Sequence, residues 1–105
     1  MSHEVVEQLA GLSSRVDNLV ANTTGDACRQ LERLQERLEK LTLAAISADL
    51  QESQSGYAGA LSAITSANET IGEGDAQIQQ ISKTIALIAK AADAVESLVK
   101  KAAAM

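Results

Sequence analysis

The sequence has no proline, tryptophan or phenylalanine, and only one tyrosine among its 105 residues. Folds built on β-sandwiches or barrels need aromatic and β-branched residues with frequent turn signals, so this scarcity argues against them. Hydrophobic residues nevertheless make up 46% of the chain and charged residues only 22%, which argues against disorder. We therefore predict an all-α fold with a single domain over residues 1–105.

Basic residues are also scarce, with 9 Lys and Arg against 14 Asp and Glu and a net charge of −5. The densest basic stretch, 29–40, is interleaved with glutamates, so we expect no nucleic-acid binding. The single Cys28 can form no internal disulfide. The first residues lack the pattern of a secretion signal, and the longest charge-free apolar run, 84–89, is too short to span a bilayer. The cytoplasm is the expected location, with no transmembrane segment.

Apolar residues in the first half recur at helical spacing. Helices are predicted at about 4–22 and 27–51 because apolar positions follow one another in steps of three and four. Residues 22–26 interrupt the pattern with turn-forming types and predict a kink or short loop, with Asp26 as a candidate N-cap. Small polar residues over 52–56 predict a hairpin loop.

The second half carries one uninterrupted heptad frame from 57 to 103. Its two seam positions hold Tyr57, Ile64, Ile71, Ile78, Ile85, Ala92 and Val99, and Ala60, Ala67, Gly74, Ile81, Ile88, Val95 and Ala102. Gly72 and Gly74 lie inside the frame, and each costs about 1 kcal/mol relative to alanine in a helix. The constant phase favours one long helix with a weak point at 72–75 over two helices that meet there.

The apolar face of this frame is wider than one partner helix can cover, because its flanking positions include Leu61, Ala63 and Ala89. We therefore predict a long antiparallel helical hairpin with coiled-coil-like heptads that associates into a four-helix bundle. Its partner would be another copy, giving a homo-oligomer (dimer or tetramer), or another helical protein. The alternative is a compact monomer that folds back at 22–26 and 72–75.

The apolar stripe is the predicted interaction surface of a non-enzymatic protein–protein interaction module. Such a module would be a self-assembling scaffold, an adaptor or a small chaperone-like partner that buries the stripe against partner helices. The predicted surface consists of Leu31, Leu34, Leu38, Leu41, Ile64, Ile71, Ile78, Ile81, Ile85, Ile88, Val95 and Val99.

Polar residues form no recognisable catalytic or metal-binding pattern. His3 lies near the chain end, Cys28 has no histidine base nearby, and the glutamates at 32–39 alternate with arginines. We expect no enzyme activity, no cofactor and no metal site.

Tyr57 directly follows the predicted hairpin loop, where we expect it to close the end of the bundle. The segment Gly56-Tyr57-Ala58-Gly59 resembles, at three positions, the tryptophan-x-glycine turn of small secreted ESAT-like proteins, with tyrosine in place of tryptophan. This resemblance implies an alternative function as a small exported or membrane-acting helical hairpin, such as a secretion-system substrate.

Overall fold

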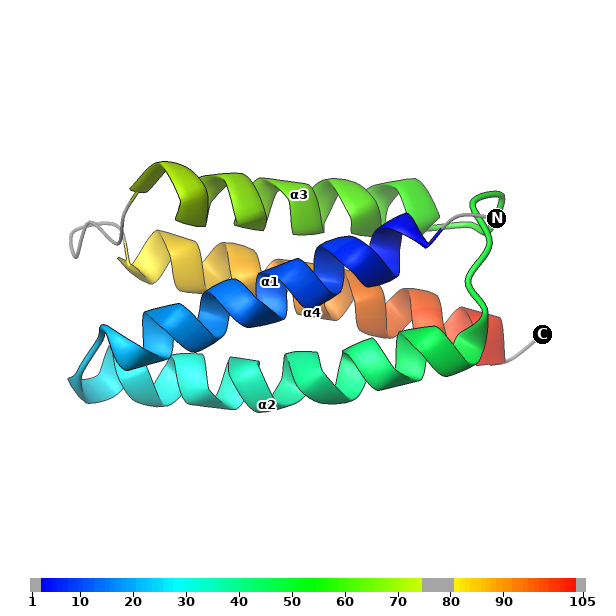
Figure 1. Cartoon of the computed structure of the whole chain (residues 1–105). Helices are drawn as coiled ribbons and strands as arrows, with labels where there is room; N and C mark the ends of the chain where they lie inside the picture. Colours follow the sequence, from blue (N-terminus) through cyan, green and yellow to red (C-terminus); the bar gives the residue numbers. More distant parts are fainter. Residues whose placement is uncertain (1–2, 75–80, 104–105) are drawn as a thin grey trace.

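The part of the chain that the structure describes folds into four α-helices (Figure 1). A computed structural model describes residues 3–74 and 81–103, and these ranges contain no strand. The helices are α1 (Glu4–Ala21), α2 (Gly25–Ala48), α3 (Tyr57–Gly74) and α4 (Ile81–Ala103). Successive helices run in opposite directions, so that α1 begins and α4 ends at the same end of the bundle (Figure 1). The predicted all-α fold with a four-helix bundle arrangement is confirmed. One chain supplies all four helices, which matches the alternative that folds back at 22–26 and 72–75.

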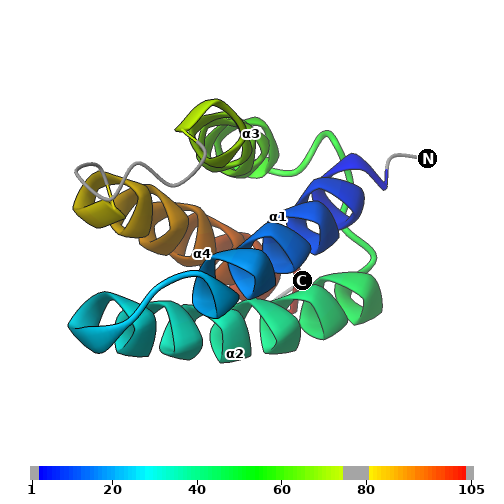
Figure 2. The same cartoon turned by 60° about the vertical axis from the view of Figure 1, so that its left-hand side comes forward.

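The helices form a ring in which each one packs against two others. α1 contacts α2 and α3, while α4 contacts α2 and α3. Figure 2 shows α2 and α3 at opposite corners, with α1 and α4 between them. The linker between α2 and α3, residues 49–56, must therefore cross the end of the bundle. The result is two antiparallel hairpins, α1/α2 and α3/α4, packed side by side.

This arrangement covers apolar faces that are too wide for a single neighbour. The largest fully buried side chains come from all four helices: Val5, Leu9, Leu12, Val16, Leu31, Leu38, Ile64, Ile88, Val95 and Leu98. The accessible surface is 6238 Å², close to the roughly 5,600 Å² expected of a compact monomer of this mass. The chain thus encloses most of its apolar stripe without a partner.

The single helix favoured for 57–103 is instead two helices, which corrects that prediction. α3 ends at Gly74, and α4 lies alongside α3 rather than continuing it. The two glycines weaken the helix at this point, and folding back lets both apolar faces bury each other. The residues between the two helices, including Ile78, lie outside the described residues.

The inward face of α4 also differs from the predicted seam. It consists of Thr84, Ile88, Ala91, Ala92, Val95 and Leu98. The seam residues Ile81, Ile85 and Val99 are only half-buried and lie at the edge of the core. A constant heptad phase is therefore compatible with two separate helices. The apolar face of α4 is broad enough that the helix can turn about its axis by about one residue and still keep this face covered by its neighbours.

The turn between α1 and α2 is closed by side chains. Asn22 Nδ2 donates to the carbonyl oxygen of Asn18, and Thr23 Oγ1 donates to that of Leu19, both at 2.8 Å. These bonds serve carbonyl groups near the end of α1, and the carbonyl oxygen of Leu19 also accepts the backbone N–H of Asn22 at 3.1 Å. The N-cap of α2 is Thr24 rather than the predicted Asp26, which lies in the first turn of the helix. Gly25 supplies the positive φ of 72° that the turn requires.

The linker 49–56 is anchored where it crosses the bundle end. Asp49 leaves α2 in the left-handed conformation with φ of 52°, and Leu50 is buried behind it. Gln54 Nε2 donates to the carbonyl oxygen of Leu98 on α4 at 3.0 Å. The backbone N–H of Tyr57 then donates to the carbonyl oxygen of Gln54 at 3.0 Å as α3 begins. These bonds join the linker to both α3 and α4.

Asn68 of α3 makes a buried polar contact with α1. Asn68 is 7% exposed. Its Nδ2 donates to the backbone carbonyl oxygen of Gln8 at 3.2 Å and to the Gln8 Oε1 at 3.1 Å. Buried amides of this kind favour one helix register, because sliding the helices would leave the donor without an acceptor. The pair therefore helps to fix how α1 lies against α3.

The inward face of α2 can be tested with two leucines on the same helix. Leu38→Ala removes a fully buried side chain and is expected to lower the free energy of unfolding by about 2–5 kcal/mol. The matched control Leu43→Ala changes a side chain that is 68% exposed, so its effect should stay within about 0.5 kcal/mol. Urea denaturation measures both values, and equal losses would contradict this placement of α2.

Candidate functional site

The predicted interaction surface lies mainly inside the chain's own core. Its buried members are Leu31, Leu34, Leu38, Leu41, Ile64, Ile88 and Val95. Its half-buried members, at the edge of the core, are Ile71, Ile81, Ile85 and Val99, while Ile78 lies outside the described residues. The stripe is enclosed because helices of the same chain supply its neighbours. A partner could reach the buried members only if the bundle opened.

The large hydrophobic side chains that remain exposed in the described ranges are Leu43 and Ile46, both on α2. Leu43 is 68% exposed and Ile46 is 58% exposed. Leu43 follows the inward Leu41 by two residues, which places it on the opposite side of a helix. That departure from the stripe is the signal in the sequence that could have identified this surface.

These two residues border a groove along the outer seam of α1 and α2. An open depression is lined by Ala10, Ser13, Glu39, Thr42 and Leu43. A deeper end cavity of about 140 Å³ is lined by His3, Val5, Val6, Ala45, Ile46, Asp49, Leu50 and Tyr57. Val6 and Ala10 lie one turn apart on α1, as do Thr42 and Ile46 on α2, so the linings of the two hollows follow one another along the seam. We call the open depression and the end cavity together the α1–α2 groove.

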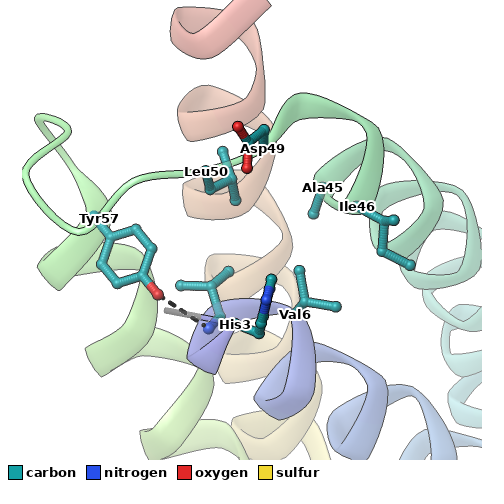
Figure 3. Close-up of a pocket in the computed structure, with 8 residues that line it drawn as sticks. His3, Val6, Ala45, Ile46, Asp49, Leu50 and Tyr57 are labelled. Atoms are coloured by element: carbon teal, nitrogen blue, oxygen red, sulfur yellow. Dashed lines mark hydrogen bonds between the residues drawn. The ribbon is translucent and has the colours of Figure 1, made fainter. Parts of the chain in front are cut away.

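Tyr57 forms one wall of the end cavity, with Ala45 and Ile46 on the other side (Figure 3). Its side chain is buried, and its hydroxyl oxygen accepts a hydrogen bond from the backbone N–H of Val5 at 3.4 Å. Tyr57 thus closes the bundle end against the first turn of α1. It is the first residue of α3, and Gly59 lies within that helix, so this segment does not form the interhelical turn that its resemblance to ESAT-like proteins implies.

A charged cluster connects α2 and α4 on another side of the bundle. The Arg37 guanidinium donates through Nη2 to Asp93 Oδ1 at 2.8 Å and to Glu96 Oε2 at 2.6 Å. Lys100 Nζ lies 3.0 Å from Glu96 Oε1. The pKa of Glu96 is lowered, mainly by the hydrogen bond from Arg37 and further by the hydrogen bond and charge of Lys100. Hydrogen bonds to the two carboxylates raise the pKa of Arg37. This arrangement clamps two helices together.

The other polar candidates stay apart. His3 is exposed at the start of α1. Cys28 is half-buried, with its Sγ 3.3 Å from Glu32 Oε1 and 3.6 Å from the carbonyl oxygen of Val20. The described residues contain no group of three or more potential metal ligands. None of the helices in these ranges combines the length and apolarity needed to cross a membrane.

Comparisons of this chain with protein-family models, with curated proteins and with solved structures find no match. A functional proposal therefore depends on the chain's own surface, where the α1–α2 groove combines exposed aliphatic side chains with two hollows along the seam.

The charged cluster predicts a specific loss of stability in acid. Because the folded state lowers the pKa of Glu96 below its usual 4.5, this carboxylate stabilises the fold above about pH 4.5, and the contribution disappears as the pH falls through the lowered value. Glu96→Gln should therefore flatten the decline in unfolding free energy between about pH 5 and pH 2. Urea titrations at each pH measure this decline.

The matched control is Glu69→Gln, an exposed carboxylate on α3 outside this cluster. A decline as steep in Glu96→Gln as in the wild type would contradict the assignment of acid sensitivity to the cluster.

Proposed function

We propose that this chain is a non-enzymatic protein–protein interaction module that binds a partner helix in its α1–α2 groove. It would serve as a scaffold, an adaptor or a small chaperone-like partner, and its partner would be another helical protein or a second copy. The exposure of Leu43 and Ile46 beside the groove carries this proposal.

The physical argument begins with the free energy of burying these two side chains. Fully burying a leucine or isoleucine contributes about 1.5–3 kcal/mol, so a partner that covers both would gain much of the free energy needed for specific binding. Grooves between helices commonly accept amphipathic helices that insert side chains at intervals of three and four residues. The two hollows along the seam provide space for such side chains.

The proposed module works without opening its bundle. The buried stripe holds the four helices together, and the outer seam of α1 and α2 meets the partner. The proposed setting is the cytoplasm, because Cys28 has no second cysteine in this sequence with which to form a stabilising internal disulfide. The alternative of an exported or membrane-acting protein predicts tight binding to lipid vesicles, which distinguishes it from the proposed function.

The proposed function is tested by comparing partners captured from cells by three proteins. The groove variant Leu43→Ala/Ile46→Ala removes the exposed aliphatic groups, and the alanines that replace them favour the helix. The control Lys83→Ala/Lys90→Ala changes exposed residues on α4. Quantitative mass spectrometry should show a specific partner retained by the wild type and control and reduced about tenfold or more by the groove variant.

Circular dichroism melting establishes that all three proteins are folded. Equal capture of every protein by the wild type and the groove variant would contradict a role for the α1–α2 groove.

A further inference from the structure

The chemistry of the α1–α2 groove also specifies the kind of helix that fits it, an inference that rests on the proposed function. We propose that its occupant is an amphipathic helix of a different protein, with an aliphatic stripe flanked by lysine or arginine. This assignment excludes a second copy of the chain as the occupant.

The length of the groove matches a short helical segment. From His3 to Ser13, which line its two ends, the chain rises about 15 Å at 1.5 Å per residue. Small side chains at Ala10, Ser13 and Thr42 line the open depression, so a partner backbone can approach closely. A partner helix that lies along this length has about three turns, so its aliphatic residues on successive turns can enter the open depression and the end cavity.

The end cavity is sized for one such side chain. Its volume of about 140 Å³ is close to the roughly 150 Å³ of an engineered apolar cavity that holds one benzene molecule. Val5, Leu50 and Tyr57 supply buried walls, while the exposed Ile46 also lines the cavity. A leucine, isoleucine or phenylalanine of the partner can fill this space and cover Ile46 at the same time.

The charges around the groove favour basic flanks on the partner. Glu39 lines the open depression and Asp49 lines the end cavity, so a carboxylate lies towards each end. Glu7, which is exposed on α1, lies one turn from Ala10. Nearby Glu36 already pairs with Lys40 at 3.3 Å. Lysine or arginine beside the aliphatic stripe of the partner would face Glu39 and Asp49.

The same charges disfavour a second copy in this groove. A two-fold dimer joins identical patches, so each acidic border would approach another acidic border. Partial desolvation strengthens such repulsion, since charges interact more strongly as the surrounding dielectric falls. Self-association here would bury Leu43 and Ile46 but bring like charges together. A basic helix gains both from burying these side chains and from the attraction between opposite charges.

Three 18-residue peptides with identical leucine positions test the inference. Their remaining positions are lysine, glutamine or glutamate, giving basic, neutral and acidic helices with the same aliphatic stripe. Fluorescence anisotropy with the full chain should show at least tenfold tighter binding of the Leu/Lys peptide than of the Leu/Gln peptide, and no saturable binding of the Leu/Glu peptide. The preference should shrink as salt is added.

Variants of the full chain locate the binding. Leu43→Ala/Ile46→Ala should weaken the binding of the Leu/Lys peptide at least tenfold. Glu39→Gln/Asp49→Asn should reduce the preference for Leu/Lys over Leu/Gln, with asparagine chosen because it tolerates the left-handed backbone at Asp49. The control Asp26→Asn/Glu69→Gln removes the same charge outside the groove lining and should retain the preference.

Several outcomes would overturn the inference while leaving an interaction function in place. One is equal binding of the Leu/Gln and Leu/Lys peptides that depends on Leu43. Another is retention of the full preference in Glu39→Gln/Asp49→Asn. A third is a light-scattering mass of twice 11.0 kDa that returns to one chain in Leu43→Ala/Ile46→Ala, because the second copy would then be the occupant.

Two outcomes would overturn the proposed function together with the inference. One is binding of the wild type, but not of Leu43→Ala/Ile46→Ala, to neutral phosphatidylcholine vesicles, which would assign the surface to lipid. The other is a single-chain mass with no saturable binding of any of the three peptides.

Discussion

The width of the apolar helix faces is the constraint on which this structure depends. A helix whose apolar residues cover more than a narrow seam must contact two neighbours, and four such helices satisfy one another in a closed ring. That ring places α2 and α3 at opposite corners, although they are consecutive in the chain. The linker 49–56 consequently crosses the bundle end, and the end cavity lies where this crossing meets α1.

Periodicity alone allowed much of the fold to be predicted. Leu9, Leu31 and Ile88 each belong to a row of apolar residues at helical spacing, and all three lie in the core. Periodicity cannot specify which chain supplies the neighbour, because a buried leucine meets the same chemistry in either case. The continuous frame through Gly72 and Gly74 was therefore compatible with one long helix as well as with two that fold back. The choice depends on the total apolar area available, which is a property of the whole chain.

The candidate site was less predictable than the core. Leu43 and Ile46 lie off the stripe, where isolated apolar residues are common on protein surfaces, and their meaning depends on hollows formed jointly by α1 and α2. The position of Tyr57 at a bundle end followed from its place after the loop, but its hydrogen bond to Val5 required the packing of α1 against α3. The Arg37 cluster likewise joins residues more than fifty positions apart.

The scarcity of aromatic residues gives the bundle end a built-in optical reporter. Tyr57 is the only aromatic side chain in the sequence, and its ring lies between the linker and the first turn of α1. Aromatic absorbance in the near ultraviolet and fluorescence emission from this protein therefore come from one location. Fraying of the first turn of α1 alters the tyrosine signal while most of the helical circular dichroism persists, which separates local opening of this end from global unfolding.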